Sequence, residues 1–170
     1  MTLRITVIAP LAFILVAGLS PVPAAGQQKS LKEQLVGTWQ YVSAVNIKPD
    51  GSRVPLFGPS PEGRISFDGK GNYVLMVARS GQPKFAANDR NQGTSDEYKA
   101  VVQGSIAHFG KYTVNEAEKT ITFNIETCTF PNWNGVSQKR PFSMSGNELR
   151  WKTPAASSGG SAELVLKRLE

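Results

Sequence analysis

The sequence has one cysteine, Cys128, and one histidine, His108, among its 170 residues. A single cysteine excludes a disulfide within the chain, and one histidine with one distant cysteine supplies no ligand cluster of the kind that holds zinc or copper. Nucleophilic catalysis needs an oriented base, for which His108 is the one histidine available, and no Gly-x-Ser-x-Gly sequence accompanies it. We therefore expect neither a metal nor another cofactor.

Charge of one sign is not concentrated in any segment. The formal net charge is +6 at pH 7, from 19 basic and 13 acidic residues. A basic protein can bind nucleic acid, but the cations here are scattered, and Lys139-Arg140 and Lys167-Arg168 are the only adjacent pairs beyond the first thirty residues. The pattern indicates a solvated basic surface, and no nucleic-acid partner is expected.

Long apolar runs are missing except at the N-terminus. Arg4 precedes the apolar run Ile5–Val16, and prolines and alanines follow it, which is the order of a secretory signal peptide. The run of about 12 residues is short of the roughly 20 that a membrane-spanning helix needs. We expect residues 1–26 to be a signal peptide cleaved between Ala24 and Gln27. This predicts a periplasmic or secreted protein with no stable membrane insertion after cleavage.

Residues 27–170 form short alternating runs broken by Gly, Pro, Asn and Asp, a pattern typical of antiparallel all-β proteins. One domain fits this length. About eight strands can be counted, the number at which a closed barrel is just wide enough for side chains or one small ligand. The prediction is a single antiparallel, up-and-down β-barrel. The side chains expected to share a face of the first strand are Trp39, Tyr41, Ser43, Val45 and Ile47.

One short helix is expected in the middle of the chain. Thr94 and Glu97 have the spacing of a capping box, in which each side chain accepts a hydrogen bond from the other's backbone N–H. Tyr98, Val101 and Val102 follow at helical spacing. This apolar stripe is expected to lie over a barrel mouth.

Several short motifs resemble those of bacterial lipocalin-like domain proteins. They are Leu35-Val36-Gly37-Thr38-Trp39, Phe57-Gly58 with Pro61-Glu62-Gly63, Arg90 with Gly93-Thr94 and Glu97, Phe109-Gly110-Lys111-Tyr112-Thr113-Val114, and Pro131-Asn132-Trp133-Asn134-Gly135 with Gln138 and Arg140. Together they cover most of the chain after residue 34. The resemblance implies the barrel fold and names no ligand.

The wider lipocalin and calycin pattern also implies a structural pair. In that pattern a Trp at the start of the barrel is covered by an Arg from the last strand, and Trp39 and Arg168 stand at these positions. The chain departs from secreted lipocalins in having no cysteine pair and in placing its helix mid-chain rather than before the last strand.

Polar side chains on otherwise apolar strand faces are the candidate ligand-binding residues. Their positions in the alternation predict that they point inward, where an unpartnered polar group is costly. The candidates are Arg140, Gln138, His108, Arg79 and Tyr112, with Trp133 in a loop that borders the expected cavity.

The inward arginine Arg140 needs a partner of opposite charge, and three readings stay open. The partner is an internal carboxylate, with Glu97, Glu126 and Asp89 as candidates, or it is the anionic head group of a ligand, or a bulge turns Arg140 outward. In the ligand reading, aromatic residues surround the apolar body of the ligand. These are Phe123, Trp133, Phe142 and Trp151.

The leading functional hypothesis is a carrier or sensor of a small, partly apolar, anionic compound. The alternative is an isomerase or cyclase in the same cavity, using His108, Tyr112 and Glu97 as acid and base groups. A third hypothesis is a protein-binding inhibitor barrel that uses the loops around Trp133 and Phe85. A filled interior with exposed Trp133 would favour the third, and a roomy cavity around a His108 with displaced pKa would favour the enzyme.

Overall fold

The computed structural model describes residues 29–169, so the expected signal peptide lies outside the described residues. Strands dominate. They are β1 (Gly37–Ile47), β2 (Arg53–Pro55), β3 (Pro61–Phe67), β4 (Asn72–Arg79), β5 (Ser105–Asn115), β6 (Thr120–Cys128), β7 (Ser137–Ser145), β8 (Glu148–Thr153) and β9 (Ser161–Arg168). The helices are α1 (Leu31–Leu35), α2 (Ser95–Gly104) and the 3-10 turn η1 (Pro131–Trp133). Within residues 29–169, no helix is both long and apolar enough to cross a membrane.

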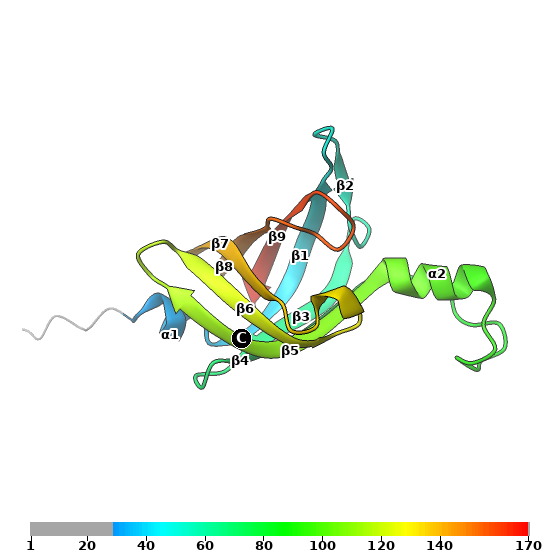
Figure 1. Ribbon diagram of the computed structural model, residues 1–170, viewed down its shortest axis with the longest axis horizontal. Coiled ribbons are helices and arrows are strands. Elements are labelled where there is room, and N and C mark those ends of the chain that lie inside the picture. The colour runs from blue at the N-terminus through cyan, green and yellow to red at the C-terminus, as the bar shows by residue number, and fades with distance from the viewer. Residues whose placement is uncertain (1–28, 170) are drawn as a thin grey trace, which may run out of the picture.

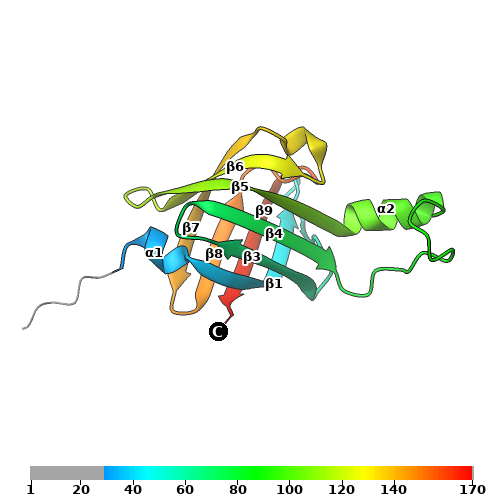
Figure 2. The same cartoon turned by 90° about the horizontal axis from the view of Figure 1, so that it is seen from below.

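The strands form one closed antiparallel barrel (Figures 1 and 2). From β3 to β9 each strand pairs with the next in sequence, and β1 closes the barrel by pairing with both β3 and β9. The far half of β1 also pairs with the short strand β2, which lies outside the eight-stranded ring. The predicted antiparallel, up-and-down barrel of about eight strands is confirmed, with β2 as an addition.

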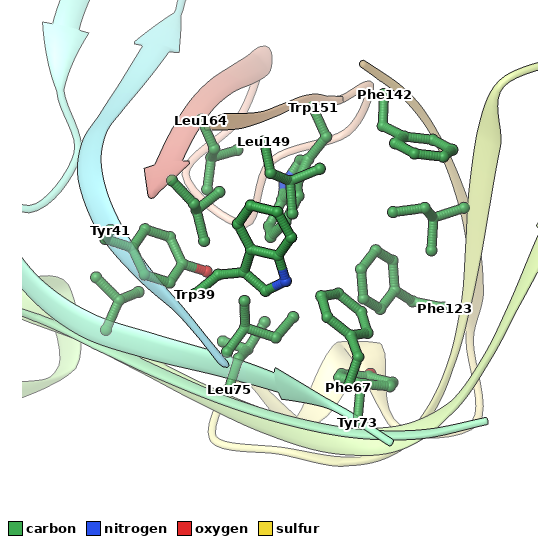
Figure 3. Close-up of a cluster of buried hydrophobic side chains, with 14 of the residues drawn as sticks. Trp39, Tyr41, Phe67, Tyr73, Leu75, Phe123, Phe142, Leu149, Trp151 and Leu164 are labelled. Atoms are coloured by element: carbon green, nitrogen blue, oxygen red, sulfur yellow. The ribbon is translucent and has the colours of Figure 1, made fainter. Parts of the chain in front are cut away.

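Alternate side chains from every wall meet in the barrel interior (Figure 3). Burial alternates along β3, β4, β6 and β8, because successive side chains of a strand point to opposite faces. Large rings fill much of this space. They include Trp39, Tyr41, Phe67, Tyr73, Phe123, Phe142 and Trp151.

The prediction that Trp39, Tyr41, Ser43, Val45 and Ile47 share one face is wrong for the second half of β1. The pairing of β1 with β9 shifts register between Tyr41 and Ser43, so a bulge interrupts the alternation. As a result Ala44 and Asn46 are buried in place of Ser43 and Val45. A single extra residue in one strand moves every later side chain to the opposite face of the sheet. The local sequence carries no signal of this bulge.

The end of the barrel that carries the chain's first helix is closed. Helix α1 begins with a capping box between Ser30 and Glu33, which the sequence carries as Ser-Leu-Lys-Glu and which was not predicted. Leu35 ends this helix fully buried, and its carbonyl accepts a hydrogen bond of 2.8 Å from Trp39 Nε1. We call this the closed end. The opposite rim, formed by the segments around Phe57, Trp133 and Ala156, is the open end.

Helix α2 begins at the predicted capping box, but it does not lie over the barrel mouth. It leads directly into β5 and projects away from the barrel in both views (Figures 1 and 2). Tyr98 packs on Phe85 of the preceding loop, with ring centres 5.7 Å apart, and Val102 is 75% exposed. The loop that precedes α2 contacts the helix in place of the barrel. In addition to the Tyr98–Phe85 contact, Glu97 accepts a hydrogen bond from the Ala86 N–H at 2.8 Å.

Candidate functional site

A small cavity lies inside the open end of the barrel. Its volume is about 40 Å³, which is enough for a ligand head group and far below the several hundred Å³ that enclose a drug-sized ligand. Apolar side chains form most of its wall, among them Leu56, Phe57, Leu75, Val77 and Leu164. The polar groups on the wall come from Tyr41, His108, Arg140, Thr153 and Ser157.

Arg140 is the one cation on this wall. It lies in the middle of β7 with its side chain inward, as the alternation predicted, and it is only 3% exposed. Its Nη2 donates a hydrogen bond of 2.7 Å to Oε1 of Gln138, while its Nε is buried without a hydrogen-bond partner among the described residues. Burial lowers the pKa of Arg140 to about 10, so the guanidinium still carries its charge at neutral pH.

None of the carboxylates in residues 29–169 forms a salt bridge with Arg140. Of the three internal partners that the sequence offered, Glu97 caps α2 and Asp89 accepts hydrogen bonds within its own loop. Glu126 is exposed on β6. The bulge that would turn Arg140 outward is also missing, because β7 pairs in regular register with both neighbours. The described residues therefore support neither an internal carboxylate partner nor an outward turn of Arg140.

Two aromatic rings support the buried guanidinium. The central carbon of Arg140 lies 4.5 Å from the ring centre of Phe123 and 5.9 Å from that of Trp133. Aromatic faces attract a cation, which offsets part of the cost of taking the charge out of water. They supply no countercharge, so the cavity stays electropositive.

His108 lies beside Arg140 and shares its aromatic neighbours. Its ring centre is 6.3 Å from Phe123 and 5.9 Å from Trp133, and its Nδ1 is 2.8 Å from the hydroxyl of Tyr73. Burial, with a smaller contribution from the charge of Arg140, lowers the pKa of His108 to about 3. The imidazole is therefore neutral at physiological pH and a weak base.

Three polar cavity residues were missed by the sequence reasoning: Tyr41, Thr153 and Ser157. Tyr41 is buried, and its hydroxyl makes no hydrogen bond with the described residues. Thr153, at the end of β8, is also buried and lines the same cavity. Tyr41 shares the inward face of β1 with Trp39, so its position was predictable from alternation. A tyrosine among core aromatics, however, gave no signal of a binding role.

The structure does not bring all the candidate residues together. His108, Arg140 and Trp133 line the cavity, and Gln138 contacts it through Arg140. Tyr112 is buried toward the closed end, where its hydroxyl donates to the Asp68 carbonyl at 2.7 Å. Arg79, on the inward side of the alternation, stands at the last residue of β4 and is exposed. A strand's alternation continues past the point where the barrel wall ends, which is why Arg79 was misplaced.

A larger groove of about 500 Å³ lies over β1, β7, β8 and β9. Two of its cations already have acidic partners: Arg53 pairs with Glu163 at 2.7 Å, and Arg150 with Glu148 at 2.6 Å. These pairs are exposed and make weak contributions to stability or binding. The groove contains no buried unpaired charge, so the smaller cavity is the better candidate site.

Metal binding finds no support within residues 29–169, where no three His, Cys, Asp or Glu side chains gather closely enough to hold an ion. The buried thiol of Cys128 accepts a hydrogen bond from the Phe130 N–H at 3.3 Å. What the cavity offers is a fixed cation, a neutral imidazole and aromatic walls, an arrangement suited to holding an acceptor-rich molecule.

The model of the lipocalin-like domain family matches residues 36–169, which is nearly all of the described chain. The chain belongs to the lipocalin-like domain family. This lipocalin-like protein is 28% identical over 84 residues to the 4'-hydroxy-3'-methoxypropiophenone carrier protein ppsC of Aspergillus oryzae (strain ATCC 42149 / RIB 40), a match that covers 46% of this chain and 76% of the relative. Among solved structures it is similar to a lipocalin-like protein from Bacteroides uniformis ATCC 8492, with 14% identity, a TM-score of 0.43 and coverage of 79% of this chain and 98% of the other.

Proposed function

We propose that this protein is an exported carrier or sensor that binds a small, partly apolar, anionic molecule at the open end of its barrel. One observation carries the proposal: the Arg140 guanidinium is buried and charged, and no carboxylate of the described residues pairs with it. A buried charge left in this state costs several kcal/mol, and an anionic ligand removes that cost.

The cavity dimensions limit how the ligand sits. About 40 Å³ accommodates a head group such as a carboxylate but not a whole ligand. The body of the ligand then lies nearer the rim, against apolar side chains such as Phe57, Trp133 and Ala156. This arrangement favours a compact ligand with an aromatic or short aliphatic body over a long fatty acid.

The fungal relative supports a carrier role, because its name describes a carrier of a small aromatic compound. Export is supported by the N-terminal pattern of a basic residue, an apolar run and small residues in 1–26. The proposed location is the periplasm or the cell exterior.

Catalysis in the same cavity is the weaker candidate. An imidazole with a pKa of about 3 is a poor general base at neutral pH. The other acid and base candidates, Tyr112 and Glu97, lie outside the cavity. The inhibitor hypothesis also weakens, since Trp133 is only partly exposed and packs on His108, while Phe85 packs on Tyr98 in the projecting helix.

The proposal can be tested with benzoate as the probe, by isothermal titration calorimetry on the mature protein. Arg140→Met should weaken benzoate binding by about 10- to 100-fold, since it removes hydrogen bonds to a charged acceptor. Arg140→Lys should also weaken it, because lysine keeps the charge but lacks the planar fork. Arg64→Met, at an exposed position on β3, is the matched control. Wild-type affinity in Arg140→Met would exclude the proposed site.

A further inference from the structure

The hydrogen bond between Tyr73 and His108 fixes which ring nitrogen of His108 is free. Tyr73 lies on β4 and His108 on β5, and both side chains point into the barrel. The hydroxyl of Tyr73 is 2.8 Å from Nδ1 of His108. Because His108 also lines the cavity, its other ring nitrogen, Nε2, is the one that a molecule in the cavity can reach.

Which of the two atoms donates this hydrogen bond follows from the burial of the Tyr73 hydroxyl and the neutral state of the His108 ring. Burial raises the pKa of Tyr73, so its hydroxyl keeps its proton, and the only hydrogen bond of that hydroxyl within residues 29–169 is to His108 Nδ1. A buried O–H without an acceptor costs about 1–3 kcal/mol. The phenol therefore donates, and Nδ1 accepts. A neutral imidazole that accepts at one nitrogen carries its proton on the other.

We propose that His108 presents an Nε2–H donor to the cavity and, together with the guanidinium of Arg140, selects carboxylates over their neutral amide analogues. Tyr73 is the positioning residue that holds His108 in this form. The inference rests on the proposed function, and it names the ligand class and a second specificity-determining residue beside Arg140.

The two donors are placed to act on one head group. Arg140 lies over the rings of Phe123 and Trp133, and His108 makes edge-on contacts with the same two rings. Both side chains line one cavity, which is too small for more than a head group. A carboxylate offers acceptors only, so both of its oxygens can be satisfied there. An amide of the same size places its NH₂ group against one of the two donors. That NH₂ group and the donor facing it are then left without a hydrogen-bond acceptor. Selection then comes from the mismatch as well as from the charge.

Nuclear magnetic resonance tests the donor assignment without any ligand. His108 is the only histidine, so in mature, tag-free protein the long-range ¹H–¹⁵N spectrum of the imidazole contains one residue's signals. At pH 7 we expect the ¹⁵N shifts of a neutral ring with the proton on Nε2. A ring protonated on Nδ1 would overturn the inference, whatever the protein binds.

Calorimetry with benzoate and benzamide tests the selection. His108→Phe removes the donor and should weaken benzoate binding about 10- to 100-fold and narrow the preference for benzoate over benzamide. His108→Gln restores an N–H near the position of Nε2. It should recover part of the benzoate affinity and part of the preference for benzoate over benzamide. Benzoate binding that depends on Arg140 but is unchanged in His108→Phe would overturn the pairing and leave the proposed function standing. No benzoate binding by the wild-type protein would contradict both.

Discussion

The guanidinium carbon of Arg168 lies 4.1 Å from the ring centre of Trp39, and the two residues face each other across the β1–β9 pair that closes the barrel. The same guanidinium donates to the Val36 carbonyl at 2.8 Å and to the Gln34 carbonyl. Arg168 therefore satisfies backbone carbonyls at the C-terminal end of α1 while covering the tryptophan. The stack that the family pattern implied is present at the closed end.

Arg168→Ala should lower the free energy of unfolding by about 1–2 kcal/mol, through lost packing and cation–π attraction. Chemical denaturation followed by tryptophan fluorescence measures the change. Arg64→Ala, at an exposed position, is the control and should remain within about 0.5 kcal/mol of wild type. An unchanged midpoint for Arg168→Ala would show that the stack adds nothing to stability.

Arg140→Met should leave the protein as stable as wild type or raise the free energy of unfolding by about 1–3 kcal/mol in the absence of ligand. The substitution keeps the volume and removes a buried charge that has no carboxylate partner in residues 29–169. Urea denaturation at pH 7 is the measurement. A loss of more than about 2 kcal/mol would mean that Arg140 is held by the fold and serves architecture rather than binding.

His108 should make the protein sensitive to acid. Its pKa is about 3 in the folded protein against an ordinary value of 6.5, so between these values the unfolded chain binds more protons. Stability from this residue is complete above about pH 6.5 and is lost toward pH 3, by up to about 1.4 kcal/mol per pH unit. His108→Gln should flatten this part of the stability curve. Parallel curves for wild type and variant across this window would contradict the burial of a neutral imidazole.

Gly110 should be intolerant of any side chain. At this position β5 pairs with β6 across a bulge, and a β-carbon would collide with the Asn124 carbonyl oxygen. We expect Gly110→Ala to destabilise the protein by at least about 1–3 kcal/mol. Gly69→Ala is the matched control, because a β-carbon there has no atom within 4 Å. Equal thermal stability of the two variants would be incompatible with this bulge.

Much of the barrel was predictable because alternation and turn residues report directly on strand faces. Asp68-Gly69-Lys70-Gly71 is a sequence typical of a hairpin turn and joins β3 to β4, and the Thr94–Glu97 capping box predicted the start of α2. The β1 bulge was not predictable, since it depends on the pairing with β9, more than a hundred residues away. The direction of α2 likewise depends on its contacts with the preceding loop rather than on its own stripe.

Part of the candidate site was also predictable from the alternation of side chains along the strands. Alternation put Arg140 and His108 inside the barrel, which the structure bears out. It could not say where along the barrel each inward side chain lies, so Tyr112 and Arg79 were grouped with them although one is near the closed end and the other is past the wall. The hydrogen bond between Tyr73 and His108 joins residues 35 positions apart and needed the β4–β5 register.

The most direct test of the central claim is to observe the Arg140 side chain while an anion is added. The Nε–H signal of Arg140, assigned by comparison with Arg140→Lys, can be followed by ¹H–¹⁵N nuclear magnetic resonance during a benzoate titration. We predict a saturable shift of this signal with the same dissociation constant that calorimetry gives, and no such shift with benzamide at equal concentration. An Arg140 signal that stays unchanged while benzoate binds would contradict the claim that this buried guanidinium receives the ligand.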